Sequence, residues 1–262
     1  MEVRWFEQAL ADVRVQDDWF SPWERSHLAT LRFPKRRADW RLGRWTAKHA
    51  VAYDLNLPHD VGDLAGIEIR PAASGAPGVF LDTGPANLTI SISHRAGVAA
   101  CAVTTGGAML GCDLEVVEPR SDAFVADYFT AEEQEVVRQA SAADRFAVIS
   151  LIWSAKESAL KALNAGLRMD TRRLSVVLND LDNAGLRDLR SRKPDSLASM
   201  PHPLWRALRV SYKPQQVFHG WWFRCADLLR TEVSLSPTHP PDGIRTGSAF
   251  ATAYAASLEK PT

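Results

Sequence analysis

The sequence predicts an α+β fold in which antiparallel strands and packed helices occupy separate stretches of the chain. Three short runs between residues 88 and 117 have the character of strands. Two longer stretches, 34–55 and 146–163, have the apolar spacing and length of helices. Further strand-like runs, rich in aromatic and small apolar residues, follow at 208–212, 217–226 and 249–255.

The first helix is predicted at residues 34–55, which contain no turn cluster and place apolar residues at near-helical spacing. Basic residues are concentrated there, namely Lys35, Arg36, Arg37, Arg41, Arg44 and Lys48. This concentration indicates either a solvated helix face or a site whose guanidinium groups bind phosphates.

A strand meander is predicted next. Loops rich in Gly and Pro at 71–78 and 83–85 precede it. Residues 88–93 alternate apolar and polar side chains, a turn at 94–97 follows, and the runs 98–103 and 109–117 complete three strands.

The second half of the chain begins after a predicted junction near residues 117–121, which divides it into parts 1–118 and 119–262. Thr130 and Glu133 have the spacing of a capping box, and residues 146–163 read as a long helix. Loops are predicted at 191–203 and 236–243. No repeat of fixed period is apparent, although two meander-plus-helix halves would be compatible with an ancient duplication.

Composition restricts the class of protein. The 262 residues are 46% apolar and carry 31 basic and 31 acidic residues, so the chain has core material and no net charge that would attract nucleic acid or a membrane. Cys101, Cys112 and Cys225 are odd in number and lie in apolar runs, which indicates buried reduced thiols. With no signal-peptide pattern and no membrane-length apolar run, we expect a cytoplasmic protein.

Two motifs place charge on one face of an element. Asp113 and Glu115 lie two residues apart on a strand and therefore share a side, and Glu157 and Lys161 lie one turn apart on a helix. If the two elements meet, three carboxylates and an ammonium converge. Such a set can hold a magnesium-bound pyrophosphate and move protons around it.

Each motif alone has a simpler interpretation. Asp113 and Glu115 also fit the solvent-exposed face of a half-buried strand, and Glu157 with Lys161 fits an ordinary ion pair between neighbouring turns of a helix. His94 alone fits a turn histidine or a capped histidine of the core. Residues 106–111 have the outer glycine spacing of a P-loop, but Cys112 and Asp113 stand where that motif requires Lys and Ser or Thr, so this kind of nucleotide site is excluded.

Taken together and in order, the motifs resemble those of the 4′-phosphopantetheinyl transferases of the surfactin-synthetase-activating type. The likeness covers roughly residues 33–178. It is carried by Leu42-Gly43-Arg44, Ser91-Ile92-Ser93-His94, Gly111-Cys112-Asp113-Leu114-Glu115, Trp153-Ser154-Ala155-Lys156-Glu157-Ser158-Ala159-Leu160-Lys161, Gly166-Leu167 and Leu174-Ser175-Val176.

The resemblance implies a monomer of two similar α+β halves, each a small antiparallel sheet with helices, with the active site in the cleft between them. It implies transfer of the phosphopantetheine arm of coenzyme A to a serine of an apo acyl or peptidyl carrier protein. It further implies that the reaction requires magnesium and releases 3′,5′-ADP.

The resemblance also implies roles for individual residues. Asp113, Glu115 and Glu157 match the metal ligands, Glu157 also matches the base for the serine hydroxyl, and Lys161 matches the lysine that contacts the phosphate. His94 resembles the histidine at the 3′-phosphate of coenzyme A. Further coenzyme A contacts are expected from Ser93, Arg44 and Arg36 or Arg37.

The sequence departs from the family at two places. Gly75-Ala76-Pro77 lacks the cation that the family often has between Gly and Pro, and Arg95 stands where Ser is common. We hypothesise that Arg95 replaces the missing cation beside His94. We also expect residues 119–130, with Arg120, Phe124 and Phe129, to form the edge on which an acidic carrier helix docks.

Two other functions remain open from the sequence. One is a different magnesium-dependent phosphoryl or nucleotidyl enzyme that uses the same carboxylates. The other is a degenerate homologue that binds coenzyme A or a carrier domain without turnover.

Overall fold

The computed structural model describes residues 1–72, 74–178, 205–212, 216–241 and 244–246. It is a mixed α+β structure with antiparallel sheets, as the sequence predicted. The predicted strand at 249–255 and the predicted loop at 191–203 lie outside the described residues.

The first sheet has the strand order β12-β1-β6-β5. Strand β1 runs antiparallel to β6 and parallel to β12, and β5 and β6 form a hairpin whose turn contains Ala96 and Gly97, both with positive φ. The strands are β1 (Arg4–Ala9), β5 (Leu88–Arg95), β6 (Val98–Thr105) and β12 (Ile244–Thr246).

The second sheet is antiparallel throughout, with the order β7-β11-β10-β9-β8. Its strands are β7 (Leu110–Val116), β8 (Leu174–Leu178), β9 (Arg206–Tyr212), β10 (Val217–Cys225) and β11 (Leu228–Ser234). A third, small sheet consists of β2 (Glu68–Pro71), β3 (Pro77–Leu81) and β4 (Gly84–Pro85).

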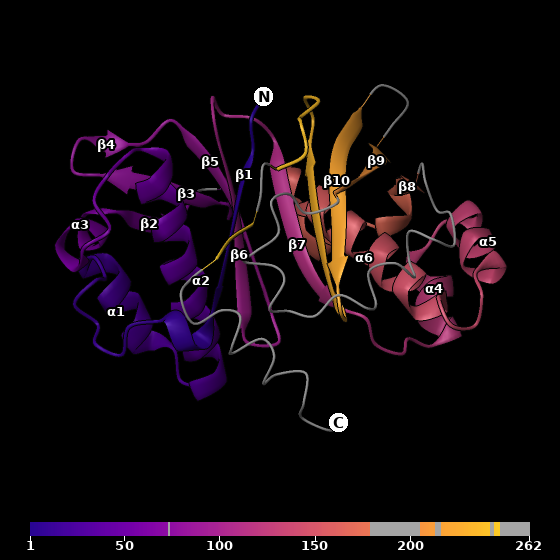
Figure 1. Ribbon diagram of the computed structural model, residues 1–262, viewed down its shortest axis with the longest axis horizontal. Helices are drawn as coiled ribbons and strands as arrows, with labels where there is room; N and C mark the ends of the chain where they lie inside the picture. The colour runs from indigo at the N-terminus through magenta and orange to yellow at the C-terminus, as the bar shows by residue number, and fades with distance from the viewer. Residues whose placement is uncertain (73, 179–204, 213–215, 242–243, 247–262) are drawn as a thin grey trace.

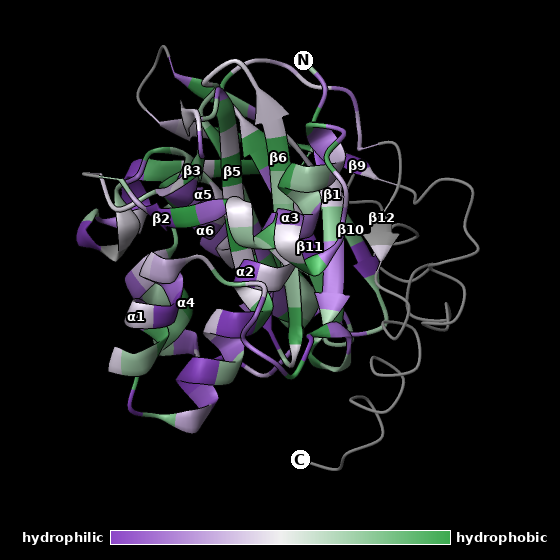
Figure 2. Cartoon of the chain, turned by 90° about the vertical axis from the view of Figure 1, so that its left-hand side faces the viewer, coloured by the Kyte–Doolittle hydropathy of each residue, from purple (hydrophilic) through white to green (hydrophobic). Residues whose placement is uncertain are grey.

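Helices cover the outer faces of the two larger sheets, giving four layers: α2, the first sheet, the second sheet and α6 (Figure 1). One hydrophobic core lies between α2 and the first sheet, and the other surrounds the second sheet. Figure 2 shows green, hydrophobic stretches along β5 and β6 of the first sheet. The helices are α1 (Pro22–Thr30), α2 (Pro34–Asp54), α3 (Val61–Gly66), α4 (Asp122–Tyr128), α5 (Ala131–Gln139) and α6 (Arg145–Ala162), and short 3-10 turns are η1 (Leu10–Asp12), η2 (Gly166–Arg168) and η3 (Thr171–Arg173).

The predicted helices and most predicted strands are confirmed. Helices α2 and α6 match the predicted 34–55 and 146–163 within a residue at each end, and β9 and β10 match the runs 208–212 and 217–226 closely. The capping box of Thr130 and Glu133 is present at the start of α5.

The predicted meander is wrong in its third strand. Strand β7 pairs with β11 of the second sheet, and side chains rather than a backbone ladder connect it to β5. The hydroxyl of Ser91 accepts from the amide of Cys112 at 2.9 Å, and that of Ser93 accepts from the amide of Leu114 at 3.2 Å. The two larger sheets therefore meet along β5 and β7. The division at 118/119 itself stays a prediction.

A buried lysine–glutamate pair organises each side of the molecule. On the first side, Lys48 of α2 lies 2.5 Å from Glu24 of α1, and Glu24 accepts from the amide of Ile69 in β2. On the second, Lys156 of α6 lies 2.7 Å from Glu133 of α5. Glu133 in turn accepts from the amide of Val176 in β8. Each pair thus joins a helix start, a central helix and a strand.

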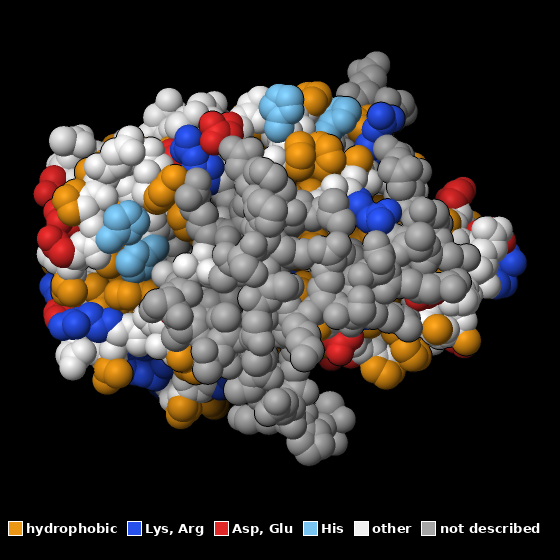
Figure 3. Space-filling view, in the orientation of Figure 1, with side chains coloured by type: hydrophobic (Ala, Val, Ile, Leu, Met, Phe, Trp, Pro, Cys, Tyr) orange, Lys and Arg blue, Asp and Glu red, His pale blue; other side chains and the backbone are white. Residues whose placement is uncertain are grey.

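The surface shows charge of both signs interspersed over the face in Figure 3, which agrees with the equal numbers of acidic and basic residues. Within the described ranges, no helix is both long enough and apolar enough to cross a bilayer.

Candidate active site

The site begins at a close contact between strand β7 and helix α6. A Cβ atom at Gly111 would lie 1.8 Å from the carbonyl oxygen of Ser158, closer than real Cβ atoms approach any atom. Only glycine therefore allows this helix to lie directly on this strand. Because strand residues two apart share a face, Asp113 and Glu115 point to the same side as Gly111, toward α6.

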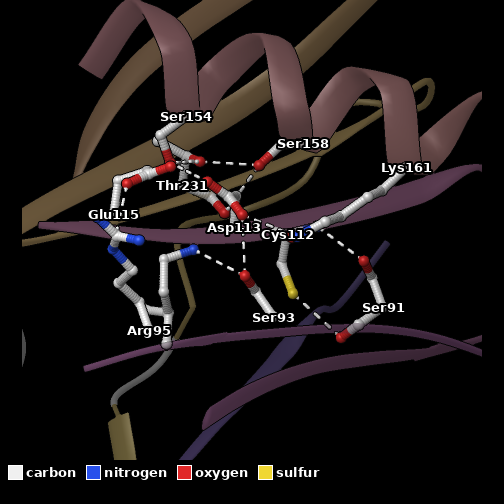
Figure 4. Close-up of polar contacts among 11 residues, drawn as sticks. Ser91, Ser93, Arg95, Cys112, Asp113, Glu115, Ser154, Ser158, Lys161 and Thr231 are labelled. Carbon is white, nitrogen blue, oxygen red and sulfur yellow. Dashed lines mark hydrogen bonds and ion pairs between the residues drawn. The ribbon is translucent and has the colours of Figure 1, made fainter. Parts of the chain in front are cut away.

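Asp113 lies at the centre of the site and is buried, with hydrogen bonds to both carboxylate oxygens (Figure 4). Its Oδ1 accepts from Ser93 Oγ at 2.8 Å and from Lys161 Nζ at 2.8 Å. Its Oδ2 accepts from Ser154 Oγ at 2.9 Å. Three donors from two elements, β5 and α6, thus fix the orientation of this carboxylate.

Lys161 lies at the edge of the site, where Nζ also donates to the carbonyl oxygen of Cys112 at 2.9 Å. Burial alone would lower the pKa of Lys161, but the nearby Asp113 carboxylate and its hydrogen bond raise it above the ordinary value. The ammonium therefore stays charged at neutral pH.

Glu115 carries a carboxylate that its surroundings satisfy poorly. Its Oε2 is buried and accepts no hydrogen bond within the described part of the chain, although Arg95 and Arg120 lie 3.6 and 3.5 Å away. Burial and the Asp113 carboxylate raise the pKa of Glu115 to about 7.

Glu157 is half-buried on α6, one turn before Lys161. Burial and the negative charge of Asp113 raise its pKa above the ordinary value. Glu157 also contributes to the raised pKa of Glu115. The Asp113 carboxylate therefore opposes the ionisation of both Glu115 and Glu157.

Asp113, Glu115 and Glu157 are the residues expected to bind a magnesium ion. In the described ranges, no group of three or more His, Cys, Asp or Glu side chains is arranged to hold a metal ion. Asp113 is engaged by Ser93, Ser154 and Lys161, so sharing a cation requires side chains to turn. The donor set still fits magnesium, because carboxylate oxygens are its preferred protein ligands and the buried Glu115 Oε2 is unsatisfied.

A cavity of about 760 Å³ adjoins this cluster. Its walls come from α2, β5 and the loop before β3 on one side, and from the end of α6 and η2 on the other. Lys161 lines it and therefore connects the carboxylates to the cavity. A space of this size accommodates a small-molecule ligand.

Two of the residues expected to bind coenzyme A also line the cavity, namely Arg44 and His94. The guanidinium of Arg44 lies 4.8 Å from the ring centroid of Trp40, and its Nε is buried without a hydrogen-bond partner in the described residues. Burial lowers the pKa of Arg44. The same Nε lies 4.0 Å from Glu24 Oε1, so this side of the guanidinium faces a carboxylate of the protein, although the residue also lines the cavity.

A family model matches part of the chain that contains the site. Residues 109–211 match the family model of the 4′-phosphopantetheinyl transferase superfamily. The comparison with curated proteins found no match.

The matched segment contains Asp113, Glu115, Glu157 and Lys161, whereas Arg44 and His94 lie before it. The predicted resemblance is confirmed for this segment at the level of the superfamily. The match covers less than half of the chain, and the description of the matched superfamily names transfer of the 4′-phosphopantetheinyl group.

The remaining residues expected at coenzyme A lie elsewhere. Ser93 binds Asp113, and Arg36 is exposed on α2 without lining the cavity. Arg37 donates to the carbonyl oxygens of Leu28 and Leu31 at the end of α1. These contacts hold the Ser93 and Arg37 side chains within the protein.

Arg95 points away from His94, because neighbouring residues on a strand face opposite sides. It donates to Glu118 at 2.6 Å and lies near Glu115. The structure therefore does not place it as the substitute cation that the sequence suggested.

The expected docking edge is partly core. Phe129 is 1% exposed and lies under Lys156, so it is not available to a partner. Phe124 is half-buried against Tyr128 and Trp153, with Arg120 over its ring. Only Arg120 and Phe124 of the three named residues remain partly accessible.

Sequence reasoning missed the hydroxyl groups that support the acidic cluster. Ser154 and Ser158 both contact Thr231 Oγ1 of β11, at 2.8 and 2.7 Å. A signal for the serines exists in their spacing, since Ser154, Ser158 and Lys161 follow one helix face. Thr231 had no such signal, because its position depends on the pairing of β7 with β11.

Proposed function

We propose that this protein transfers the 4′-phosphopantetheine arm of coenzyme A to a serine of an apo acyl or peptidyl carrier protein, releasing 3′,5′-ADP and depending on magnesium. The observation that carries the proposal is the fixed Asp113–Lys161 pair between a carboxylate cluster and a cavity of about 760 Å³. It lies within the segment that matches the phosphopantetheinyl transferase superfamily.

The residues divide the chemistry between them. Arg44 and His94 bind the nucleotide in the cavity, and Lys161 contacts the phosphate to be transferred. Asp113, Glu115 and Glu157 would hold magnesium, which neutralises charge on the pyrophosphate when bound.

Glu157 carries out the proton transfer, and Lys161 stabilises charge. The serine oxygen forms a bond to the phosphorus that carries the pantetheine arm, while the bond from that phosphorus to the bridging oxygen of the pyrophosphate breaks. The bridging oxygen leaves with the 5′-phosphate of 3′,5′-ADP. Glu157 takes the serine proton, and its raised pKa makes it a better base near neutral pH. The ammonium of Lys161 stabilises the negative charge that develops on the phosphates.

The finer assignments belong to this proposal as well: the surfactin-synthetase-activating type, a monomer of two similar halves and a cytoplasmic location. The two buried lysine–glutamate pairs support similar halves. Three buried free cysteines suit a reducing compartment.

The test is incubation with coenzyme A, magnesium and a panel of apo carrier proteins, with the carrier's mass as the readout. We expect one phosphopantetheine group to be added and 3′,5′-ADP to appear. Asp113→Ala and samples without magnesium serve as controls.

Tight binding of coenzyme A without transfer to any carrier would instead support a binding module. A different nucleotide product would indicate another magnesium-dependent phosphoryl enzyme.

A further inference from the structure

One cation on the cavity wall has no role in the chemistry described so far. Arg168 ends the turn η2, lines the cavity, and is exposed to solvent. Within the described residues, it makes no ion pair or hydrogen bond through its side chain. Its guanidinium is therefore available to a ligand.

Three other arginines of this region already bind groups of the protein. Arg95 pairs with Glu118, Arg37 binds two carbonyl oxygens, and Arg41 binds Asp17 and the carbonyl oxygens of a neighbouring loop. These contacts hold their guanidinium groups in place within the protein. Arg168 differs from these arginines because it lines the cavity.

The charged lining of the cavity is mainly positive. Arg44, Lys161 and Arg168 face a single carboxylate, that of Asp39, which is itself paired with Lys35 at 2.8 Å. Arg44 comes from the first wall, whereas Lys161 and Arg168 come from the second. This distribution favours a ligand with more than one anionic group.

The chain places Lys161 and Arg168 at different points along the second wall. Lys161 is fixed to Asp113 at the carboxylate cluster. Beyond it, Asn164 and Gly166 both have positive φ, so the helix ends and the chain turns while continuing to line the cavity. Arg168 follows seven residues after Lys161, beyond this turn, and lines the same cavity.

We propose that Arg168 binds a second phosphate of the substrate, remote from the phosphorus that is transferred. The inference rests on the proposed function, under which this group is the 3′-phosphate of coenzyme A. The nucleotide then contacts Arg44 on one wall and Arg168 on the other, so its binding links the two sides of the molecule.

Equilibrium binding tests this assignment without turnover. Adenosine 3′,5′-bisphosphate and adenosine 5′-monophosphate are titrated into the parent protein and into Arg168→Ala by calorimetry. We expect the variant to bind the bisphosphate about tenfold more weakly, because one charge-assisted contact is lost. Affinity for the monophosphate should stay at the parental value.

A matched control is Arg172→Ala, since Arg172 is an exposed arginine four residues away that pairs with Asp170 and does not line the cavity. It should bind both nucleotides like the parent. Parental affinity of Arg168→Ala for the bisphosphate would overturn the inference while leaving the proposed function intact, and so would an equal loss for both nucleotides. Failure of the parent itself to bind the bisphosphate would overturn both.

Discussion

At the scale of single residues, short hydroxyl side chains determine where the acidic cluster points. Ser93 and Ser154 donate to opposite oxygens of Asp113, and Lys161 completes its hydrogen bonds. Serine has few rotamers to lose, so such contacts orient a charged group at small entropic cost. A carboxylate held in this way is ready for its partners before substrate arrives.

Lys161→Met should reduce turnover by roughly 10²–10⁴-fold, because the methionine keeps the length of the side chain and removes its charge. Measurement of kcat with coenzyme A and a responsive apo carrier checks this expectation. Arg138→Ala, on the exposed face of α5 beside Glu135, is the control and should retain parental turnover. Near-parental kcat in Lys161→Met would remove this lysine from the proposed chemistry.

At the scale of elements, the contact between β7 and α6 depends on one missing side chain. Gly111 faces the backbone of Ser158 and Ala162, which cannot move aside as a flexible side chain can. This contact also sets the distance between the side chains of the site, because Asp113 is on β7 and Glu157 and Lys161 are on α6. The glycine in the acidic motif therefore has a packing function.

Gly111→Ala should lower the free energy of unfolding by roughly 1–3 kcal/mol and should reduce transfer as well, because α6 must move away from Asp113. Urea denaturation and the carrier assay measure the two effects. Gly66→Ala is the control, since its Cβ would meet no atom within 4 Å. Unchanged stability in Gly111→Ala would contradict the close approach.

The two buried lysine–glutamate pairs connect elements in corresponding ways. Lys48 also donates to the carbonyl oxygens of Trp19 and Leu64, and Lys156 donates to those of Tyr128, Thr171 and Leu174. Each ammonium thus binds segments that are distant from it in the sequence.

Lys48→Met and Lys156→Met should each destabilise the fold by about 3–5 kcal/mol, since each leaves a buried glutamate unpaired. Adding Glu24→Gln or Glu133→Gln to the corresponding variant should restore part of the loss, because the uncompensated charge is removed. Urea unfolding of the four variants tests both pairs in parallel. If only one of the two lysine substitutions lowered the free energy of unfolding, the two pairs would not stabilise the fold in the same way.

At the scale of the whole molecule, a buried ion pair joins the two larger sheets. Arg230 of β11 donates from Nε and Nη2 to the two carboxylate oxygens of Glu7 in β1, at 2.5 and 2.8 Å. Trp5 donates to the same carboxylate. Together with the serine contacts of β5 to β7, this network fixes the relative placement of the two sides of the cavity.

Glu232 should make global stability depend on pH. Burial raises its pKa to about 8. Between about pH 4.5 and about pH 8 the unfolded chain has this carboxylate ionised, while the folded protein keeps it protonated. The folded state then binds the extra proton, so stability falls as pH rises, by up to about 1.4 kcal/mol per pH unit from this group, and levels off above its folded pKa.

Urea denaturation across this pH range, in the parent and in Glu232→Gln, measures the contribution. The difference between the two proteins isolates Glu232 from other groups, including Glu115, whose pKa is also raised. Parallel pH profiles would show that Glu232 is ionised in the folded protein.

The sequence alone determined the secondary structure around the site and the chemical identity of its main residues. Helical periodicity defined α2 and α6, and strand alternation placed Asp113 and Glu115 on one face. It also contained a repeat that a search for a fixed period missed: Phe20-Ser21 with Glu24 and then Trp45-Thr46-Ala47-Lys48, against Phe129-Thr130 with Glu133 and then Trp153-Ser154-Ala155-Lys156.

Only the tertiary structure decided which elements meet. The pairing of β7 with β11, the support of Asp113 by Ser93 and Ser154, and the direction of Arg95 all depend on contacts between residues far apart in the chain. Local sequence cannot specify them, because periodicity reports which face of an element is apolar and not which partner covers that face. The location of Arg168 at the cavity follows from the same long-range packing.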